Sequence, residues 1–285
     1  MSKYSQQYFT FKVTSDGVIR WKNNAQNSSF TGRTISYSLN SGTTWTDITS
    51  VSGSSAPTIS VSSGDTVMFK GNNSNYAIDN TYYAGFSGTT CGFEVEGNIM
   101  SLVYGDNFIG NRTLTDNYAF CSLFKWCNTL TSAENLVLPA TTLTECCYRA
   151  MFSNCTNMTV APKLPATTLA PMCYWYMFEK CTLITSIELP AKTLVGTSNS
   201  DGCYGHMFTS TTNLTYIKCL ADNPNTIYTY QWLYAGKTGT FVKAKGVEWP
   251  SEASGIPTGM TVEEYSEPLK PVPINKIFIN GNNIN

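Results

Sequence analysis

Charged side chains are scarce in this sequence. Asp, Glu, Lys and Arg make up 13% of the 285 residues, about half of their share in an average soluble protein. The 18 basic and 19 acidic residues nearly cancel, leaving a formal net charge of -1, and there is one histidine. Proteins that bind nucleic acid or lie on anionic lipid carry a basic excess, so we expect neither partner.

Long apolar runs are also missing. The sequence contains no run of about 18 apolar residues, the length that a membrane-spanning helix needs, so membrane insertion is not expected. The segment Met1–Gln7 leads directly into Tyr8–Phe11 without the apolar core of a secretory signal. We therefore expect a chain that is not exported through such a signal, with its ten cysteines in the reduced state.

The first hundred residues alternate apolar and polar side chains between turn residues, which is typical of short β-strands. Phe9, Phe11 and Val13 share one face of the first of them, and further strands are predicted at Thr58–Val61 and Thr66–Lys70. Strands of this length and spacing predict an antiparallel, immunoglobulin-like β-sandwich over residues 1–97.

One hairpin carries a recognisable motif. The segment Ser38-Leu39-Asn40-Ser41-Gly42-Thr43-Thr44-Trp45 resembles the Asp box of sialidases, with Asn40 in the Asp place. The resemblance implies a structural hairpin remote from catalysis, in which Asn40 caps backbone N–H groups and Trp45 packs on the sheet. A glycan-active enzyme is the alternative, although no Gly-rich phosphate loop or nucleophile motif accompanies the box.

Residues 118–215 contain an internal repeat. The copies align on Phe124, Phe152, Phe178 and Phe208, which are 28, 26 and 30 residues apart. Three of these phenylalanines are the last residue of a Cys-Tyr-x-x-Met-Phe motif. A Leu-Pro-Ala-Thr-Thr-Leu block at 138–143 recurs at 164–169 and, with one change, at 189–194. Two motifs that recur in phase indicate one structural unit repeated along the chain.

Each copy predicts a short helical turn followed by an extended segment. In Cys-Tyr-x-x-Met-Phe the apolar positions i, i+1, i+4 and i+5 share one helical face, and the two x positions point outward. Pro139, Pro165 and Pro190 end the extended segments, because proline lacks the N–H that a strand ladder needs. One unit cannot bury its own apolar face but stacked units can, which predicts a solenoid.

The pattern Leu-Pro … Cys-Tyr-x-x-Met-Phe-x-x-Cys-x-x-Leu resembles the BspA-like leucine-rich repeats, in the variant seen in gut anaerobes and their phages. The resemblance covers about residues 98–260 and implies a leucine-rich-repeat solenoid that binds partners rather than catalysing a reaction. We expect the solenoid and its terminal cap at 98–245. Residues 246–285 are then a Pro-containing linker and a C-terminal strand, in which Ile277, Phe278 and Ile279 are candidates for assembly with a neighbour.

Most cysteines fall at repeat positions or beside them, namely Cys121, Cys127, Cys147, Cys155, Cys173, Cys181 and Cys203. Their spacing of about 26 residues favours a ladder of small buried thiols. Disulfides and a zinc site are the alternatives, although zinc ligands normally occur as closely spaced pairs that converge on one point. No metal or cofactor is expected.

The candidate binding residues occupy the outward x positions, where the residue type changes between copies: Arg149, Trp175, Tyr176 and His206. Solvent-facing aromatic rings on a neutral surface could stack on sugar rings or dock on a protein. The alternative is that these rings only pack against the neighbouring copy or the N-terminal domain. The histidine has no evident nucleophile beside it in the sequence, which favours a surface residue.

Together these features predict a non-enzymatic virion protein of a phage, made in the host cytoplasm. We expect a tail or fibre component that binds a glycan or protein of the host surface, assembles with other virion proteins and forms a homo-oligomer. A bacterial cell-surface adhesin is the first alternative. A head-decoration or head-fibre protein is the second.

Overall fold

The computed structural model describes residues 2–233 and 236–266 of the chain. The fold is mainly β with a few short helices, as expected from the sequence. The helices are η1 (Lys3–Gln6), η2 (Gly53–Ser55), α1 (Ser101–Tyr104), η3 (Gly105–Asn107) and η4 (Glu252–Ser254). The strands are β1 (Phe9–Val13), β2 (Gly17–Arg20), β3 (Lys22–Asn23), β4 (Thr34–Ser38), β5 (Thr46–Thr49), β6 (Thr58–Val61), β7 (Thr66–Gly71), β8 (Ala84–Gly85), β9 (Phe93–Asn98), β10 (Leu130–Val137), β11 (Ser186–Leu189), β12 (Tyr216–Cys219), β13 (Gly239–Ala244) and β14 (Met260–Tyr265).

The first strands build a six-stranded sheet in the order β10-β9-β1-β7-β4-β5, and β2-β6 and β3-β8 form two small sheets. Central β1 pairs antiparallel with β7 and with β9, so that Phe11 lies opposite both Val67 and Val95. The hairpin of β4 and β5 has the expected structure, because Asn40 Oδ1 accepts from Thr44 N at 2.9 Å and the Trp45 ring packs against Tyr8.

The six-stranded sheet includes a strand from the repeat region. Strand β9 runs through residue 98, and β10 from the first repeat copy pairs with it in parallel. One hydrophobic core extends from Phe9 to Met260, and the Phe124 ring lies 5.7 Å from that of Phe86. Residues on the two sides of the predicted 97/98 domain boundary therefore share a sheet and a core.

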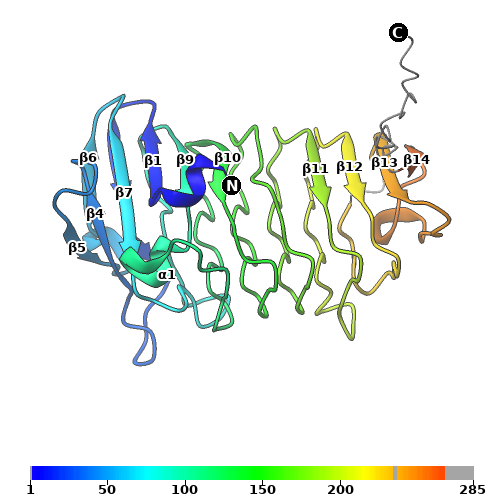
Figure 1. The fold of residues 1–285 in the computed structure, drawn as a ribbon, viewed down its shortest axis with the longest axis horizontal. Helices are drawn as coiled ribbons and strands as arrows, with labels where there is room; N and C mark the ends of the chain where they lie inside the picture. Colours follow the sequence, from blue (N-terminus) through cyan, green and yellow to red (C-terminus); the bar gives the residue numbers. More distant parts are fainter. Residues whose placement is uncertain (1, 234–235, 267–285) are drawn as a thin grey trace, which may run out of the picture.

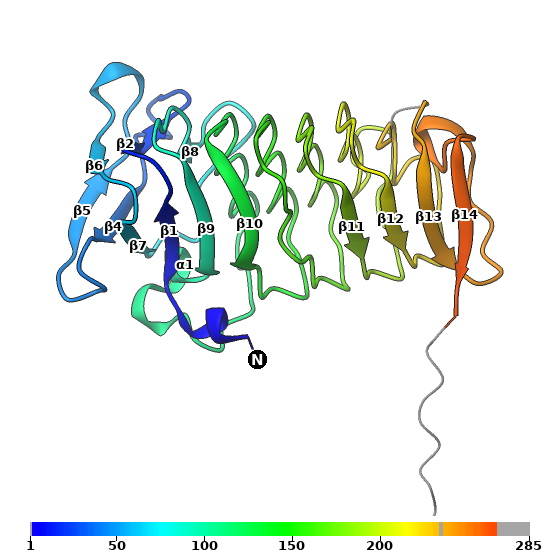
Figure 2. The same cartoon turned by 90° about the horizontal axis from the view of Figure 1, so that it is seen from above.

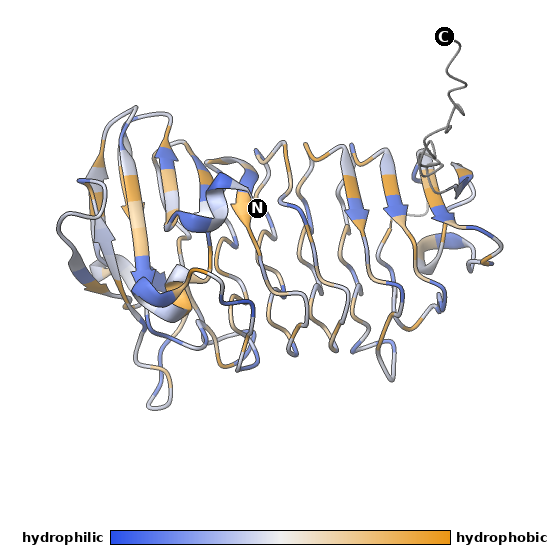
Figure 3. Ribbon diagram, viewed as in Figure 1, coloured by the Kyte–Doolittle hydropathy of each residue, from blue (hydrophilic) through white to orange (hydrophobic). Residues whose placement is uncertain are grey.

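Successive repeat copies lie side by side along the long axis of the molecule (Figures 1 and 2). Strands β11, β12, β13 and β14 form a second sheet and are parallel throughout. Their register aligns equivalent buried positions, as in Ile187, Ile217 and Phe241. Hydrophobic and hydrophilic residues alternate along these coils in Figure 3, which is the pattern expected of segments with one buried face.

The Cys-Tyr-x-x-Met-Phe segments are consecutive tight turns rather than the predicted helical turns. A residue with positive φ recurs every fourth position, as at Cys146 (55°), Ala150 (51°) and Asn154 (63°). Every second amide donates to the next copy, for example Ala150 N to Trp175 O at 2.7 Å. The left-handed residues are strained, and the hydrogen bonds between copies offset that strain.

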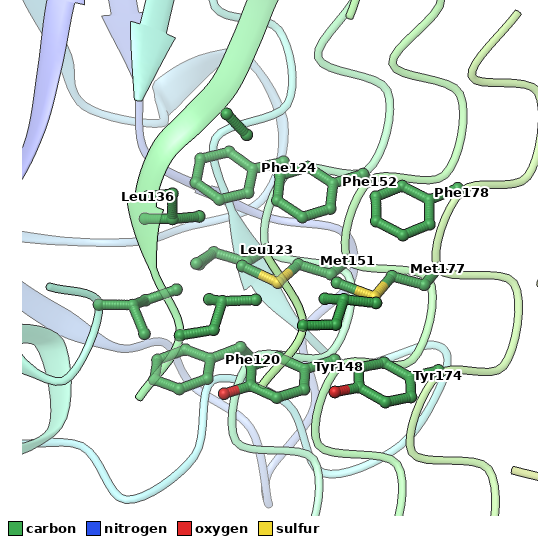
Figure 4. Close-up of a cluster of buried hydrophobic side chains, with 14 of the residues drawn as sticks. Phe120, Leu123, Phe124, Leu136, Tyr148, Met151, Phe152, Tyr174, Met177 and Phe178 are labelled. Carbon is green, nitrogen blue, oxygen red and sulfur yellow. The ribbon is translucent and has the colours of Figure 1, made fainter. Parts of the chain in front are cut away.

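Equivalent aromatic rings stack across the copies (Figure 4). In one column Phe124, Phe152, Phe178 and Phe208 have ring centroids 5.3, 5.7 and 6.0 Å apart with interplanar angles of 3–4°. A second column consists of Phe120, Tyr148, Tyr174 and Tyr204, with centroids 5.8 Å apart at each step. The columns end at Trp232, whose ring also stacks on that of Trp249.

Candidate binding surface

The tight turns repeat every four residues, so two consecutive side chains point into the core and the next two point outward. In the third copy Cys173, Tyr174, Met177 and Phe178 are buried in the core. The pair between them, at positions 175 and 176, lies on the outer side of the turns. This lateral surface carries all four residues that the sequence indicated as candidates for binding.

Trp175 is not the solvent-facing residue that the sequence predicted, because only 6% of its surface is exposed. Its ring lies over Gly205 of the next copy, where an added Cβ would come within 2.2 Å of the indole. The Arg149 guanidinium covers the ring from the preceding copy at 5.9 Å. The indole is thus held between the preceding and the following copy. This agrees with the alternative interpretation, in which the ring packs against a neighbouring copy.

Tyr176, His206 and Tyr230 form a row of half-buried rings on the same surface. The Tyr176 and His206 rings stack at 4.7 Å with an interplanar angle of 14°, and Tyr230 meets His206 edge-on at 5.4 Å. The Trp175 ring touches both Tyr176 and His206. We call Trp175, Tyr176, His206 and Tyr230 the aromatic strip.

Polar groups border the strip. Burial lowers the pKa of His206, and the nearby Glu179 carboxylate only partly opposes this effect. That carboxylate accepts a hydrogen bond from Ser153 Oγ at 2.8 Å. Thr209 Oγ1 lies 3.5 Å from His206 Nδ1, at the far limit of a hydrogen bond. The imidazole lies between two tyrosine rings, and its lowered pKa favours the neutral form.

Tyr230 is the member of the strip that the sequence did not single out. Its backbone carbonyl accepts from His206 N at 2.8 Å, as the carbonyls of Trp175 and Gly205 accept from Ala150 N and Tyr176 N, so Tyr230 occupies the position of Trp175 and Gly205 in the last copy. The segment around it had been recognised only as a degenerate last copy. The backbone bonds align Tyr228–Leu233 with Cys203–Phe208, and an aromatic residue at an outward position of that six-residue segment was the available signal.

All ten cysteines are free and buried. Three side chains at one repeat position donate to the carbonyl of the phenylalanine in the preceding copy. These are Cys155 to Phe124 at 3.1 Å, Cys181 to Phe152 at 3.0 Å and Thr211 to Phe178 at 2.6 Å. Thr211, which breaks the sequence pattern, thus keeps the same bond. Burial raises the pKa of these thiols well above the usual value, which makes them poor nucleophiles.

Lys237 is a buried cation that sequence reasoning missed. It is 4% exposed, and its ammonium donates to the Thr211 carbonyl. Burial lowers its pKa to about 8.

Within residues 2–233 and 236–266, no group of three or more His, Cys, Asp or Glu side chains is placed to hold a metal ion. The predicted assembly residues Ile277, Phe278 and Ile279 lie outside the described residues.

No family model, curated protein or solved structure matched this chain in our comparisons. Over the part of the chain that the structure describes, no helix has the length and apolar character needed to cross a bilayer.

Proposed function

We propose that this chain is a non-enzymatic adhesion protein of a phage virion, a tail or fibre component that binds a glycan or protein on the host surface. Residues 98–245 are then a leucine-rich-repeat solenoid of the BspA-like kind, and residues 1–97 an immunoglobulin-like sandwich. The stacked Phe and Tyr columns and the hydrogen bonds between copies support the solenoid.

The aromatic strip is the observation that carries the binding function. The inward positions keep nearly the same residues from copy to copy, while the outward pair changes from Arg149-Ala150 to Trp175-Tyr176, Gly205-His206 and Tyr230-Gln231. Core packing accounts for the constant positions but gives no reason for three adjacent rings on the outside. Half-exposed rings with polar edges provide a stacking surface for sugars or for an apolar protein patch.

The buried Trp175 supports the strip rather than forming its outer face. Wedged between Arg149 and Gly205, it fixes the position from which the Tyr176 and His206 rings project. A rigid platform loses little conformational entropy when a ligand binds. Contacts of this kind are weak individually, and a homo-oligomer built into a virion with other virion proteins would multiply them.

The test is binding of the fluorescently labelled full chain to intact cells and to purified surface glycans of gut anaerobes. The double variant Tyr176→Ala/Tyr230→Ala should bind at least about fivefold more weakly, since two lost stacking contacts correspond to about 1 kcal/mol or more. Trp126→Ala is the matched control, because Trp126 is also an outward aromatic residue with positive φ, 52% exposed and outside the strip.

Equal binding by wild type and the double variant would remove the strip from the function. Binding lost equally in the Trp126 control would indicate non-specific adhesion. Mass spectrometry of purified phage particles and of bacterial envelopes then separates the tail-fibre hypothesis from its alternatives. Peptides found only in the envelope would favour the cell-surface adhesin, and peptides in isolated heads would favour a head-decoration or head-fibre protein.

A further inference from the structure

The strand side of the molecule is interrupted between β10 and β11. Each of these strands is the last in its own sheet, and the segment 159–165 of the second copy lies between them. The distance from the aligned phenylalanine to the proline of the next Leu-Pro block is 15 residues in the first copy, 13 in the second and 12 in the third. The strand of the first copy is itself irregular, because β10 pairs with β9 through two register shifts, between Leu130 and Ser132 and between Ser132 and Asn135.

Pro162 completes the interruption. Proline has no N–H to donate, so the second copy cannot continue the ladder through this position. Its pairing with β10 is limited to an isolated bridge between Ser132 and Val160, and Val160 is 40% exposed. A parallel sheet that is otherwise closed by neighbouring copies is open at this point.

Two hollows lie on either side of the interruption. The first, of about 440 Å³, is open to solvent and is bordered by η1, the loop 109–112 and β10. The second, of about 540 Å³, lies between residues 161–165 and β11 and reaches Tyr216. Both are lined by Lys163 and Pro165. We call the two hollows together, from η1 to Tyr216, the strand-face groove.

The charged groups of the groove favour an anion. Arg112 and Lys163 are exposed cations in the first hollow, and neither belongs to an ion pair among the described residues. Glu134 is the acidic residue of that hollow. In the second hollow Glu188 is paired with Lys218 at 3.4 Å. The first hollow therefore has two cations against one carboxylate, in a chain whose formal net charge is -1.

The remaining lining suits a carbohydrate. Half-buried tyrosines, Tyr4 and Tyr216, stand one in each hollow, and tyrosine faces stack on sugar rings. The side chains of Gln6 and Asn135 face the first hollow and make no hydrogen bond within the described part of the chain. An added peptide strand would instead need a regular row of backbone donors, which Pro162 disrupts.

We propose that the strand-face groove binds a carboxylated polysaccharide, with about two to four sugar residues spanning the two hollows. Tyr4 and Tyr216 stack on the outer sugars, and Lys163, shared by both hollows, binds a central carboxylate with Arg112 beside it. This site is separate from the aromatic strip and does not depend on the function proposed for it.

The test uses the purified full chain and calorimetric titration with tetragalacturonate, an α2,8-linked sialic acid tetramer and a carboxyl-reduced tetragalacturonate. At least one acidic probe should bind, and the reduced probe should bind at least about tenfold more weakly. Lys163→Ala and Arg112→Ala should each lower the affinity for the acidic probe about five- to tenfold. Lys192→Ala, which removes an exposed lysine outside the groove, should leave the affinity unchanged.

Three results would overturn the proposal: no binding of either acidic probe up to about 10 mM, equal binding of the reduced probe, or an affinity insensitive to Lys163→Ala. Tetraglutamate bound as tightly, with the same dependence on Lys163, would point to an acidic peptide instead of a saccharide. Tyr176→Ala/Tyr230→Ala should keep the groove affinity, so failure of the strip and failure of the groove are distinguishable.

Discussion

The contact between Gly205 and Trp175 predicts an unusually strong coupling between two substitutions. A Cβ at position 205 would lie 2.2 and 2.4 Å from two indole carbons, so Gly205→Ala must displace the Trp175 ring from its buried position. Overpacking of this kind costs about 1–3 kcal/mol of unfolding free energy. Trp175→Ala removes a side chain that is 6% exposed and should cost about 3–5 kcal/mol.

The double variant should be no less stable than Trp175→Ala alone, because the clash disappears with the indole. The expected coupling energy is therefore about 1–3 kcal/mol in favour of the double variant. Urea unfolding followed by far-ultraviolet circular dichroism measures it without relying on tryptophan fluorescence. The control is Gly205→Ala in a Tyr176→Ala background, because the three atoms nearest to the new Cβ all belong to Trp175 and none to Tyr176.

Additive costs of the two substitutions would refute the reasoning, because they would mean that the added methyl group and the indole do not compete for one space. A Gly205→Ala protein with an unchanged free energy of unfolding would refute it as well.

The Gly205→Ala variant also bears on binding. Displacement of Trp175 should weaken adhesion through the Tyr176 and His206 rings that it touches, with the strand-face groove unaffected.

Two further predictions concern the buried repeat positions. Thr211→Val keeps the shape of the side chain but loses the hydrogen bond to the Phe178 carbonyl, so it should lower the unfolding free energy by about 0.5–1.5 kcal/mol. Thr211→Cys should keep most of that free energy, and equal urea midpoints for the two variants would contradict this. Burial raises the pKa of thiols such as Cys147 and Cys173, so above about pH 9 they ionise only in the unfolded chain. The unfolding free energy should then fall by about 1.4 kcal/mol per pH unit for each fully buried thiol, and a flat stability profile between pH 8 and 10 would contradict it.

The strands of the first hundred residues could be predicted because their pattern is local. Alternating residues and turn glycines place Phe9–Val13 and Thr58–Val61 with the bounds that the structure has. The pairing of β9 with β10 could not be foreseen, since it joins residues 37 to 39 positions apart through a parallel register that no local signal specifies.

The repeat was visible in the sequence, but its local geometry was assigned wrongly. Apolar residues at i, i+1, i+4 and i+5 fit a helix of period 3.6 and a series of turns of period four equally well over six residues. The difference lies in the left-handed residues, such as Ala150 and Tyr176, whose strain is offset only by hydrogen bonds to the neighbouring copy. A single copy therefore contains too little information to choose between the two.

The same dependence on neighbours explains the candidate surface. The position of Trp175 is decided 30 residues away by Gly205. Tyr230 meets His206 only because the backbone bonds align the degenerate last copy with the one before it. The strand-face groove has the converse origin, because it opens where copies differ in length and Pro162 breaks the ladder. In a stack of similar units the repeated residues build the core, and the candidate binding features arise where one copy departs from the next.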